Sequence, residues 1–266
     1  MTHSDGERPL AVVTGASSGI GYELAKQFAE HGFDLLVNAE DGALDAAAER
    51  LASNGAQVTA VRADLRRFEG VEQLAAAIAA QRSPVAAAAL NAGIGTGGPF
   101  VEGDLRDDLA IIQLNVASTV HLAKRLLPDM VARDEGRILI TSSIASTSPG
   151  PFQAVYNASK SFVQSFAEAL QNELKDTGVT VTSLMPGPTE TDFFRRAGME
   201  DTRLGRQPKD DPAEVARQGF EALMAGRNRK VAGSLKTKAQ EAADKVLPDS
   251  AKAAVHRRLS EPGSGE

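Results

Sequence analysis

The sequence predicts an α/β fold: a doubly wound parallel sheet of six or seven strands flanked by helices, in a single domain with a C-terminal helical extension. Short apolar segments rich in β-branched residues alternate with amphipathic segments of helical period along most of the chain. The first strand runs directly into a glycine-rich turn and a helix. With 266 residues, the chain is long enough to bury the core that such a sheet requires.

The expected elements follow one another in a regular order. Strands are expected at 10–13, 34–38, 57–61, 85–90, 137–141, 179–184 and, at the edge, 229–232. Helices are expected to end near residues 31, 54, 81, 132 and 224, and a further helix begins near Tyr156. Helices between successive strands imply right-handed crossovers and hence a parallel sheet.

Four regions are expected along the chain. Residues 1–8 should be flexible, and 9–233 should form the main domain. Residues 234–259 should form an amphipathic helical extension broken at Pro248, because proline interrupts a helix. Residues 260–266 are polar and rich in glycine and serine, so they are expected to be disordered.

Composition excludes several classes of function. The net charge of −6 gives no reason to expect a nucleic-acid or anionic-membrane partner. The absence of cysteine excludes disulfides, thiolate catalysis and zinc–sulfur sites. No metal site is expected, because the histidines are not at ligand spacing, and we interpret all four as structural or solvent-facing: His3, His31, His121 and His256. A polar N-terminus and the lack of a membrane-length apolar segment predict a soluble, cytoplasmic protein.

The turn after the first strand reads TGASSGIG from Thr14 to Gly21. Gly15 permits a tight turn, Gly19 lets the backbone approach a ligand, and Gly21 allows the helix to pack close to the strand. Free N–H groups at the start of the helix attract a pyrophosphate. Such a turn alone is weak support for a nucleotide site, but its place between a strand and a helix strengthens it.

A candidate acid/base pair lies near residue 160. Tyr156 and Lys160 are four residues apart in a helical segment, so both are expected on one face. A phenol titrates near pH 10, and a neighbouring ammonium favours its ionised form. Ser142 and Ser143 follow an apolar strand, at the edge of the sheet where ligands bind. Taken alone, these patterns are more often an ordinary helix pair and an ordinary turn.

Other polar residues sit at comparable places. The sequence Asn91-Ala92-Gly93 closes the fourth strand, and a loop from Pro186 to Thr191 follows the sixth. Asn115 lies inside an apolar helical segment. Its amide is either a functional group or a side chain that satisfies a carbonyl within the helix.

Together these motifs resemble the short-chain dehydrogenases/reductases, in the subtype with a TGxxxGxG cofactor turn. Five features occur in the family's order: TGASSGIG from Thr14, NAG from Asn91, Asn115 in LNVAS, Ser143 with Tyr156 and Lys160, and PGPTET from Pro186. The spacing 156 − 143 = 13 selects Ser143 over Ser142 as the match to the catalytic serine. The resemblance covers about residues 10–223, and the ordered set is much more specific than any single motif.

The resemblance implies an oxidoreductase that transfers a hydride between a nicotinamide cofactor and the carbonyl or alcohol carbon of a small molecule. Tyr156 would be the general acid/base, and Ser143 would hydrogen-bond the reacting oxygen. Lys160 would hold the nicotinamide ribose and lower the pKa of the phenol, and Asn115 would support a water that links Lys160 to solvent. The alternative is a non-catalytic dinucleotide-binding sensor or scaffold on the same fold.

The resemblance also implies a set of cofactor-binding residues. Asp64 would contact the adenine, Asn91 would line the cofactor channel, and Thr189 with Thr191 would meet the carboxamide and phosphate side. Thr189 departs from the family, which commonly has an aliphatic residue there. The full set is Gly15, Ser17, Ser18, Gly19, Ile20, Glu40, Asp64, Leu65, Asn91, Ala92, Gly93, Tyr156, Lys160, Pro186, Gly187, Thr189 and Thr191.

The end of the second strand bears on cofactor choice. Ala39 stands where relatives that use NAD usually carry an Asp, and Glu40 stands where relatives that use NADP usually carry an Arg. Glu40 would accept hydrogen bonds from the ribose hydroxyls, and with Asp41 it would repel a 2′-phosphate, so NAD(H) is favoured over NADP(H). Two alternatives stay open: both acids only cap the next helix, or Arg62 and the serines of the turn restore phosphate binding.

The substrate is not specified by the sequence. The segment after Pro186, with Phe193, Phe194 and Met199, is expected to form either an amphipathic lid or an ordinary short helix. The helices around Asn115 and Tyr156 look apolar on more than one face, like the family's dimerising pair, so a homodimer or homotetramer is expected. The extension lacks an aromatic membrane anchor and is expected to cover a subunit interface or to be a solvated helix.

Overall fold

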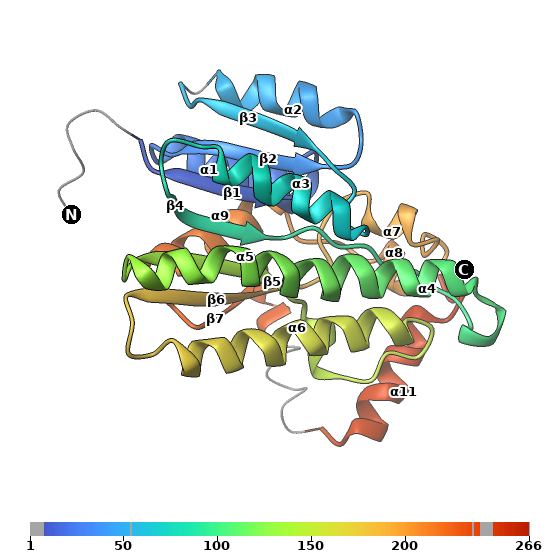
Figure 1. The fold of residues 1–266 in the computed structure, drawn as a ribbon. Helices are drawn as coiled ribbons and strands as arrows, with labels where there is room; N and C mark the ends of the chain where they lie inside the picture. Colours follow the sequence, from blue (N-terminus) through green and yellow to red (C-terminus); the bar gives the residue numbers. More distant parts are fainter. Residues whose placement is uncertain (1–7, 54, 236, 240–246, 266) are drawn as a thin grey trace.

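The computed structural model describes residues 8–53, 55–235, 237–239 and 247–265. At its centre is a seven-stranded sheet in the order β3-β2-β1-β4-β5-β6-β7, with every neighbouring pair parallel (Figure 1). The strands are β1 (Leu10–Thr14), β2 (Asp34–Ala39), β3 (Val58–Arg62), β4 (Val85–Leu90), β5 (Gly136–Thr141), β6 (Val179–Pro186) and β7 (Arg229–Ala232). This confirms the predicted fold class. The strand order reverses between β1 and β4, the place where ligands bind in open parallel sheets.

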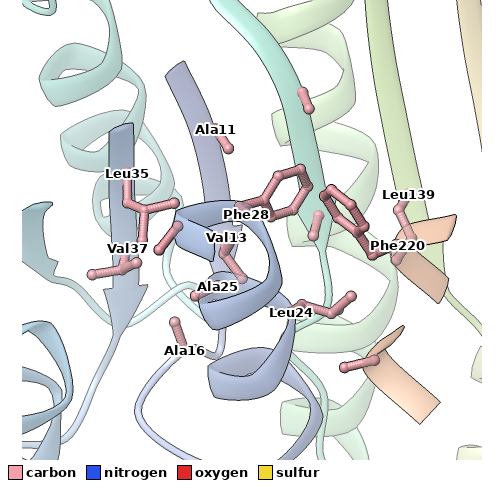
Figure 2. Close-up of a cluster of buried hydrophobic side chains, with 14 of the residues drawn as sticks. Ala11, Val13, Ala16, Leu24, Ala25, Phe28, Leu35, Val37, Leu139 and Phe220 are labelled. Atoms are coloured by element: carbon pink, nitrogen blue, oxygen red, sulfur yellow. The ribbon is translucent and has the colours of Figure 1, made fainter. Parts of the chain in front are cut away.

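Helices cover both faces of the sheet. One face packs against α1 (Gly19–Glu30), α2 (Ala43–Ala52) and α9 (Pro212–Met224). The other packs against α3 (Phe68–Ala79), α5 (Ser118–Ala132) and α6 (Ala154–Glu173), of which α5 and α6 cross the front of Figure 1. The first core joins distant parts of the chain, since Phe28 of α1 meets Phe220 of α9 edge to face, with ring centroids 5.2 Å apart (Figure 2). Two buried cores thus fix the strand ends from which the site is built.

One predicted helix is divided into three parts. The segment expected as a single helix over 104–132 consists of α4 (Leu105–Ile111), a π-helical segment (Ile112–Ala117) and α5. Asn115 lies in the π-helical segment. Such wide turns are rare and interrupt a helix without breaking its direction. Sequence periodicity does not distinguish this arrangement from a continuous helix.

Short helices follow β6 and β7. The segment expected as a lid contains α7 (Phe193–Arg196), and α8 (Arg203–Arg206) comes next. In the C-terminal extension, α11 (Asp249–Ser260) begins directly after Pro248, as expected. The first helical piece predicted for the extension includes residues 236 and 240–246, which lie outside the described residues, as do residues 1–7 of the segment predicted to be flexible.

The C-terminal end, which is expected to be disordered, makes hydrogen bonds with the segment that leads into α8. The Gly263 N–H donates to Asp201 Oδ2 (2.8 Å), and the Gly265 N–H donates to the Asp201 carbonyl (2.9 Å). The Arg203 Nε donates to the Ser264 carbonyl (2.9 Å). A polar, glycine-rich end has no apolar pattern that predicts order, but its backbone groups find partners at α8.

Candidate active site

A crevice with a cavity volume of about 450 Å³ opens at the carboxyl ends of the strands. All the residues predicted to bind a cofactor line it, together with Ser143. Asn115 is buried behind this wall, with its Oδ1 next to Gly93. The structure therefore gathers residues from five separate motifs at the switch point of the sheet.

Backbone forms the wall of the crevice at the glycine turn. Gly15 (φ 68°) and Gly19 (φ 57°) have left-handed conformations that other residues rarely adopt. A Cβ on Gly21 would overlap the carbonyl oxygen of Gly15, so α1 starts closer to β1 than any side chain would permit. Ser18 precedes α1 and is exposed, with no hydrogen bond from its side chain to the helix. The first N–H groups of α1 thus face the crevice, where they would bind an anionic group.

The loop after β4 is fixed by a network that joins three strands. The Asn91 Nδ2 donates to the Thr14 carbonyl (3.2 Å), and the Thr141 hydroxyl donates to Asn91 Oδ1 (3.1 Å). The Thr14 Oγ1 accepts from the Asn91 N–H (3.0 Å) and from the Ala92 N–H (3.0 Å). Asn91 is therefore a structural tie between β1, β4 and β5 as well as part of the crevice wall.

Asn115 holds the same loop from behind. Its Nδ2 donates to the Ile94 carbonyl (2.9 Å), and its Oδ1 accepts from the Ile94 N–H (2.9 Å). The Nδ2 also donates to the Ser159 hydroxyl of α6 (2.9 Å). The amide therefore satisfies the backbone of another segment, rather than a carbonyl of its own helix. A Cβ on Gly93 would lie 3.2 Å from both Asn115 Oδ1 and Lys160 Nζ, so these two polar groups flank one glycine.

Ser143, Tyr156 and Lys160 converge although Ser143 follows β5 and the other two lie on α6. Ser143 and Tyr156 hydrogen-bond through their hydroxyls. Lys160 Nζ donates to the carbonyl of Thr141, at the end of β5 (2.9 Å), and lies 5.9 Å from the centroid of the Tyr156 ring. The adjacent Ser142 points elsewhere, since its hydroxyl donates to the Lys160 carbonyl (3.1 Å). This supports the selection of Ser143 over Ser142 by spacing.

Burial has the largest effect on the pKa values of Tyr156 and Lys160. It raises the pKa of Tyr156 to about 12, and the hydrogen bond with Ser143 opposes this only in part. Burial also lowers the pKa of Lys160 to about 8. Burial and Ser143 account for the shifted pKa of the phenol, so the lowering of that pKa by Lys160 stays a prediction. At pH 7 the phenol is protonated and the amine is mostly an ammonium.

Carboxylates gather at the opposite end of the crevice, after β2 and β3. Arg66 Nε donates to Asp64 Oδ1 (2.8 Å), and its guanidinium also pairs with Glu40. The guanidinium holds the pKa of Asp64 below its usual range. Asp41 accepts a hydrogen bond from the Ser17 hydroxyl (2.9 Å). Sequence reasoning missed Arg66, although it follows Asp64 by only two residues.

The loop after β6 closes the crevice from the side. The Thr189 hydroxyl, which is buried, donates to the Gly187 carbonyl (2.9 Å). Thr191 reaches the glycine turn, since a Cβ on Gly19 would lie 3.0 Å from its Cγ2. Beyond it, the Phe193 ring of α7 packs on the Tyr156 ring with centroids 5.1 Å apart. The predicted lid segment therefore contacts the candidate acid/base directly.

Two further crevice residues, His256 and Leu259, come from α11. The interpretation of all four histidines as structural or solvent-facing stays a prediction, and no motif in the sequence marks His256 as a residue of the crevice wall. Among the described residues, no group of three or more His, Cys, Asp or Glu side chains is placed to hold a metal ion. Within the described ranges, no helix is both long and apolar enough to cross a membrane.

Comparison with known proteins agrees with this geometry. The family model for short chain dehydrogenase matches residues 9–201. The chain is a short-chain dehydrogenase. This dehydrogenase is 37% identical over 222 residues to 1-deoxy-11-beta-hydroxypentalenate dehydrogenase of Streptomyces exfoliatus, a match that covers 82% of the chain and 80% of that protein. Membership makes it an oxidoreductase that acts on alcohol or ketone groups.

Two solved structures show how far the similarity extends. A short-chain dehydrogenase/reductase from Burkholderia phymatum in complex with NAD superposes with a TM-score of 0.81 at 28% identity, covering 90% of this chain and 92% of that one. A short-chain dehydrogenase from Sphingobium yanoikuyae in complex with NADPH gives a TM-score of 0.79 at 28% identity, covering 84% and 87%. One of these relatives holds the plain cofactor and the other the phosphorylated one.

The crevice fits a nicotinamide dinucleotide. Gly15, Gly19 and Gly21 form a cradle in which a larger residue would be strained or would clash, and that cradle faces the start of α1. At the other end, Gly93 keeps open the space beside Lys160. The cradle would hold the pyrophosphate. The side chains of Ser143, Tyr156 and Lys160 would lie beside the nicotinamide end of the cofactor.

Proposed function

We propose that this dehydrogenase interconverts a small-molecule ketone or aldehyde and its alcohol, with Tyr156 as the general acid/base. The observation that carries the proposal is the half-buried Tyr156 phenol beside the buried Ser143 hydroxyl, with Lys160 next to them in a cofactor-sized crevice. A bound nicotinamide supplies or accepts the hydride.

The residues of the chain account for the proton. In reduction, the Tyr156 hydroxyl gives its proton to the carbonyl oxygen as the hydride reaches the carbon, and the Ser143 hydroxyl hydrogen-bonds that oxygen. The pKa of about 12 for Tyr156 keeps the phenol protonated at pH 7, ready to donate. The Lys160 ammonium offsets the negative charge that the phenolate then carries. In oxidation each transfer is reversed.

Tyr156→Phe tests the proposal. The substitution removes one hydroxyl, so the fold and cofactor binding should persist while turnover of ketones and aldehydes falls by about 100-fold to 10,000-fold. The matched control is Tyr22→Phe, which alters the other tyrosine of the chain, outside the crevice, and should leave kcat unchanged. Cofactor oxidation is followed with a panel of carbonyl compounds. Near wild-type kcat in Tyr156→Phe on a verified substrate would overturn the assignment.

The alternative is a sensor or scaffold that binds the dinucleotide without turnover. It predicts tight binding of a reduced cofactor together with no oxidation of that cofactor by any member of the panel. The buried polar side chains at α6 support an enzyme. Burying them costs free energy of folding, and they are not needed to hold a dinucleotide. A cytoplasmic location stays a prediction from the sequence.

We infer that NAD(H) is preferred over NADP(H). Three carboxylates, those of Glu40, Asp41 and Asp64, line the adenosine end of the crevice with the cation Arg66. Arg66 is already engaged by Asp64 and Glu40, so a 2′-phosphate would meet a negative surface. Arg62, whose Nη1 would lie 3.9 Å from a Cβ on Gly42, is not among the described residues that line the crevice.

Glu40→Gln tests this preference, and Asp45→Asn on the exposed side of α2 is its control. The wild type should bind NADH more tightly than NADPH. Loss of one negative charge should improve NADPH binding about fivefold, the equivalent of about 1 kcal/mol, while the control changes neither affinity. Dissociation constants from cofactor fluorescence give the result. Tighter binding of NADPH than NADH by the wild type would contradict the inference.

We also propose a homo-oligomer, at least a dimer, formed through α4, α5 and α6. Large apolar side chains are exposed on α4, on the π-helical segment that joins α4 to α5, and on α6: Leu105, Leu109, Ile112 and Phe162. Light scattering at micromolar concentration should give a dimer or tetramer mass, and Leu109→Asp should shift it toward the monomer. A monomeric wild type would contradict the proposal.

A further inference from the structure

The start of the C-terminal extension packs against the loop that closes the crevice. This loop, residues 186–191, follows β6 and carries Thr189 and Thr191 of the crevice wall. A Cβ on Gly187 would lie 2.6 Å from both the Cγ2 and the Oγ1 of Thr237, so the Thr237 side chain fills the space that a side chain at residue 187 would need. Thr237 is itself buried. The loop is therefore supported by a residue beyond the main domain that the sequence predicts.

Asp210 joins this loop to the extension. Its backbone pairs with the loop, because the Asp210 N–H donates to the Pro188 carbonyl (2.8 Å) and the Glu190 N–H donates to the Asp210 carbonyl (2.9 Å). Its carboxylate binds the extension, because Oδ1 accepts from the Ser234 N–H (3.0 Å) and Oδ2 accepts from the Thr237 hydroxyl (2.6 Å). A single residue between α8 and α9 thus contacts both segments.

The carboxylate can reach the extension because a glycine follows β7. Gly233 has a left-handed φ of 124°, and a Cβ there would lie 2.0 Å from Asp210 Oδ2. The buried Gln218 side chain of α9 holds this glycine, since its Nε2 donates to the Gly233 carbonyl (3.4 Å) and its Oε1 accepts from the Gly233 N–H (3.4 Å). The turn that receives the carboxylate is therefore fixed by α9.

We propose that Asp210 and Thr237 are positioning residues for the nicotinamide cofactor. Their hydrogen bond keeps Thr237 against Gly187, and this contact holds the loop at 186–191 in the arrangement that binds the dinucleotide. A hydrogen bond to a carboxylate is stronger than one between neutral groups. A loop that is already ordered loses less conformational entropy when a ligand binds, so its affinity for the ligand is higher. The start of the extension thus raises cofactor affinity, although Thr237 is not among the described residues that line the crevice.

Dissociation constants of NADH test this role without any substrate. Thr237→Val keeps the shape of the side chain but loses the hydroxyl, so it should weaken NADH binding about fivefold, whereas Thr237→Ser should bind nearly as the wild type does. Asp210→Ala should weaken binding at least as much, and adding Thr237→Val to it should cause no further loss, because both remove the same bond. The control is Thr180→Val on β6, whose buried hydroxyl has no hydrogen-bond partner among the described residues and should not affect affinity.

Hydrogen exchange of the cofactor-free protein separates positioning from a general loss of stability. Thr237→Val should speed amide exchange at residues 186–191 and leave the glycine turn at 14–21 unchanged. Equal acceleration at both segments, wild-type NADH affinity in Thr237→Val, or losses that multiply in the double variant would overturn the proposal. Neither measurement needs turnover, so a failure here is distinct from a failure of Tyr156 as the acid/base, which Tyr156→Phe tests separately.

Discussion

At the start of α1 the crevice is built from backbone, whereas at the start of α6 it is built from buried polar side chains. The first region needs glycine because a Cβ on Gly21 would overlap the Gly15 carbonyl, and the side chain of its serine cap, Ser18, makes no hydrogen bond to the helix. In the second region the backbone is an ordinary helix, but Lys160 and Asn115 are 5% and 2% exposed. Substitutions should therefore damage the first region through the fold and the second through turnover.

The largest effect is expected at Gly21. Gly21→Ala forces α1 away from β1, which should lower the free energy of unfolding by about 3 kcal/mol or more and weaken cofactor binding. The matched control is Gly42→Ala, at a helix start with ordinary geometry (φ −72°) and no close neighbour. It should stay within about 1 kcal/mol of the wild type. Denaturant unfolding measures both, and equal stabilities for the two variants would contradict a backbone-built cradle.

A smaller effect is expected at Lys160, where substitution should raise the free energy of unfolding instead of lowering it as at Gly21. Burial lowers its pKa from 10.5 to about 8, which costs roughly 3 kcal/mol at pH 7. Lys160→Met removes that cost but also loses the hydrogen bond to the Thr141 carbonyl. The variant should be more stable than the wild type by about 1–2 kcal/mol at pH 7, yet inactive. Lys124→Met, on the exposed face of α5, is the control and should be neutral.

The same substitution has a pH signature. Between pH 8 and pH 10.5 the folded state binds fewer protons at Lys160 than the unfolded state, so wild-type stability gains as pH rises through this window. The advantage of Lys160→Met should accordingly shrink by about 2 kcal/mol between pH 7 and pH 9.5. Tyr156, with a folded pKa of about 12, contributes in the opposite direction, but only above pH 10. A pH-independent difference between variant and wild type would exclude a titrating Lys160.

The smallest effect is expected at Ser18. Ser18→Ala removes a side chain that is exposed and makes no capping hydrogen bond, so the free energy of unfolding should change by less than about 0.5 kcal/mol. Thermal unfolding of the cofactor-free protein is the appropriate measurement. A loss of about 1 kcal/mol or more, the usual value of a helix cap, would mean that side chains as well as backbone support the glycine turn.

The two regions also differ in how well the sequence predicts them. The glycine turn is a local feature: strand, turn and helix are contiguous, so the residues that must approach each other are close in the chain. Ser143 and Tyr156 are 13 residues apart and are joined across β5 and α6, yet the family resemblance identifies both. Asn115 was identified as a site residue, but its bonds to Ile94 and Ser159 depend on the packing of three separate segments.

By itself, the sequence determined the alternation of strands and helices and a parallel sheet of six or seven strands, because periodicity and glycine placement act over a few residues. The resemblance of its motifs to a known family added the residues at the carboxyl edge of the sheet. Only the tertiary structure decided the π-helical segment around Asn115, the engagement of Glu40 by Arg66, and the entry of His256 into the crevice. Each of these features depends on which groups become buried next to one another when the chain folds. Burial decides the pKa of Tyr156 and the partners of polar atoms, and burial is a property of the packed chain.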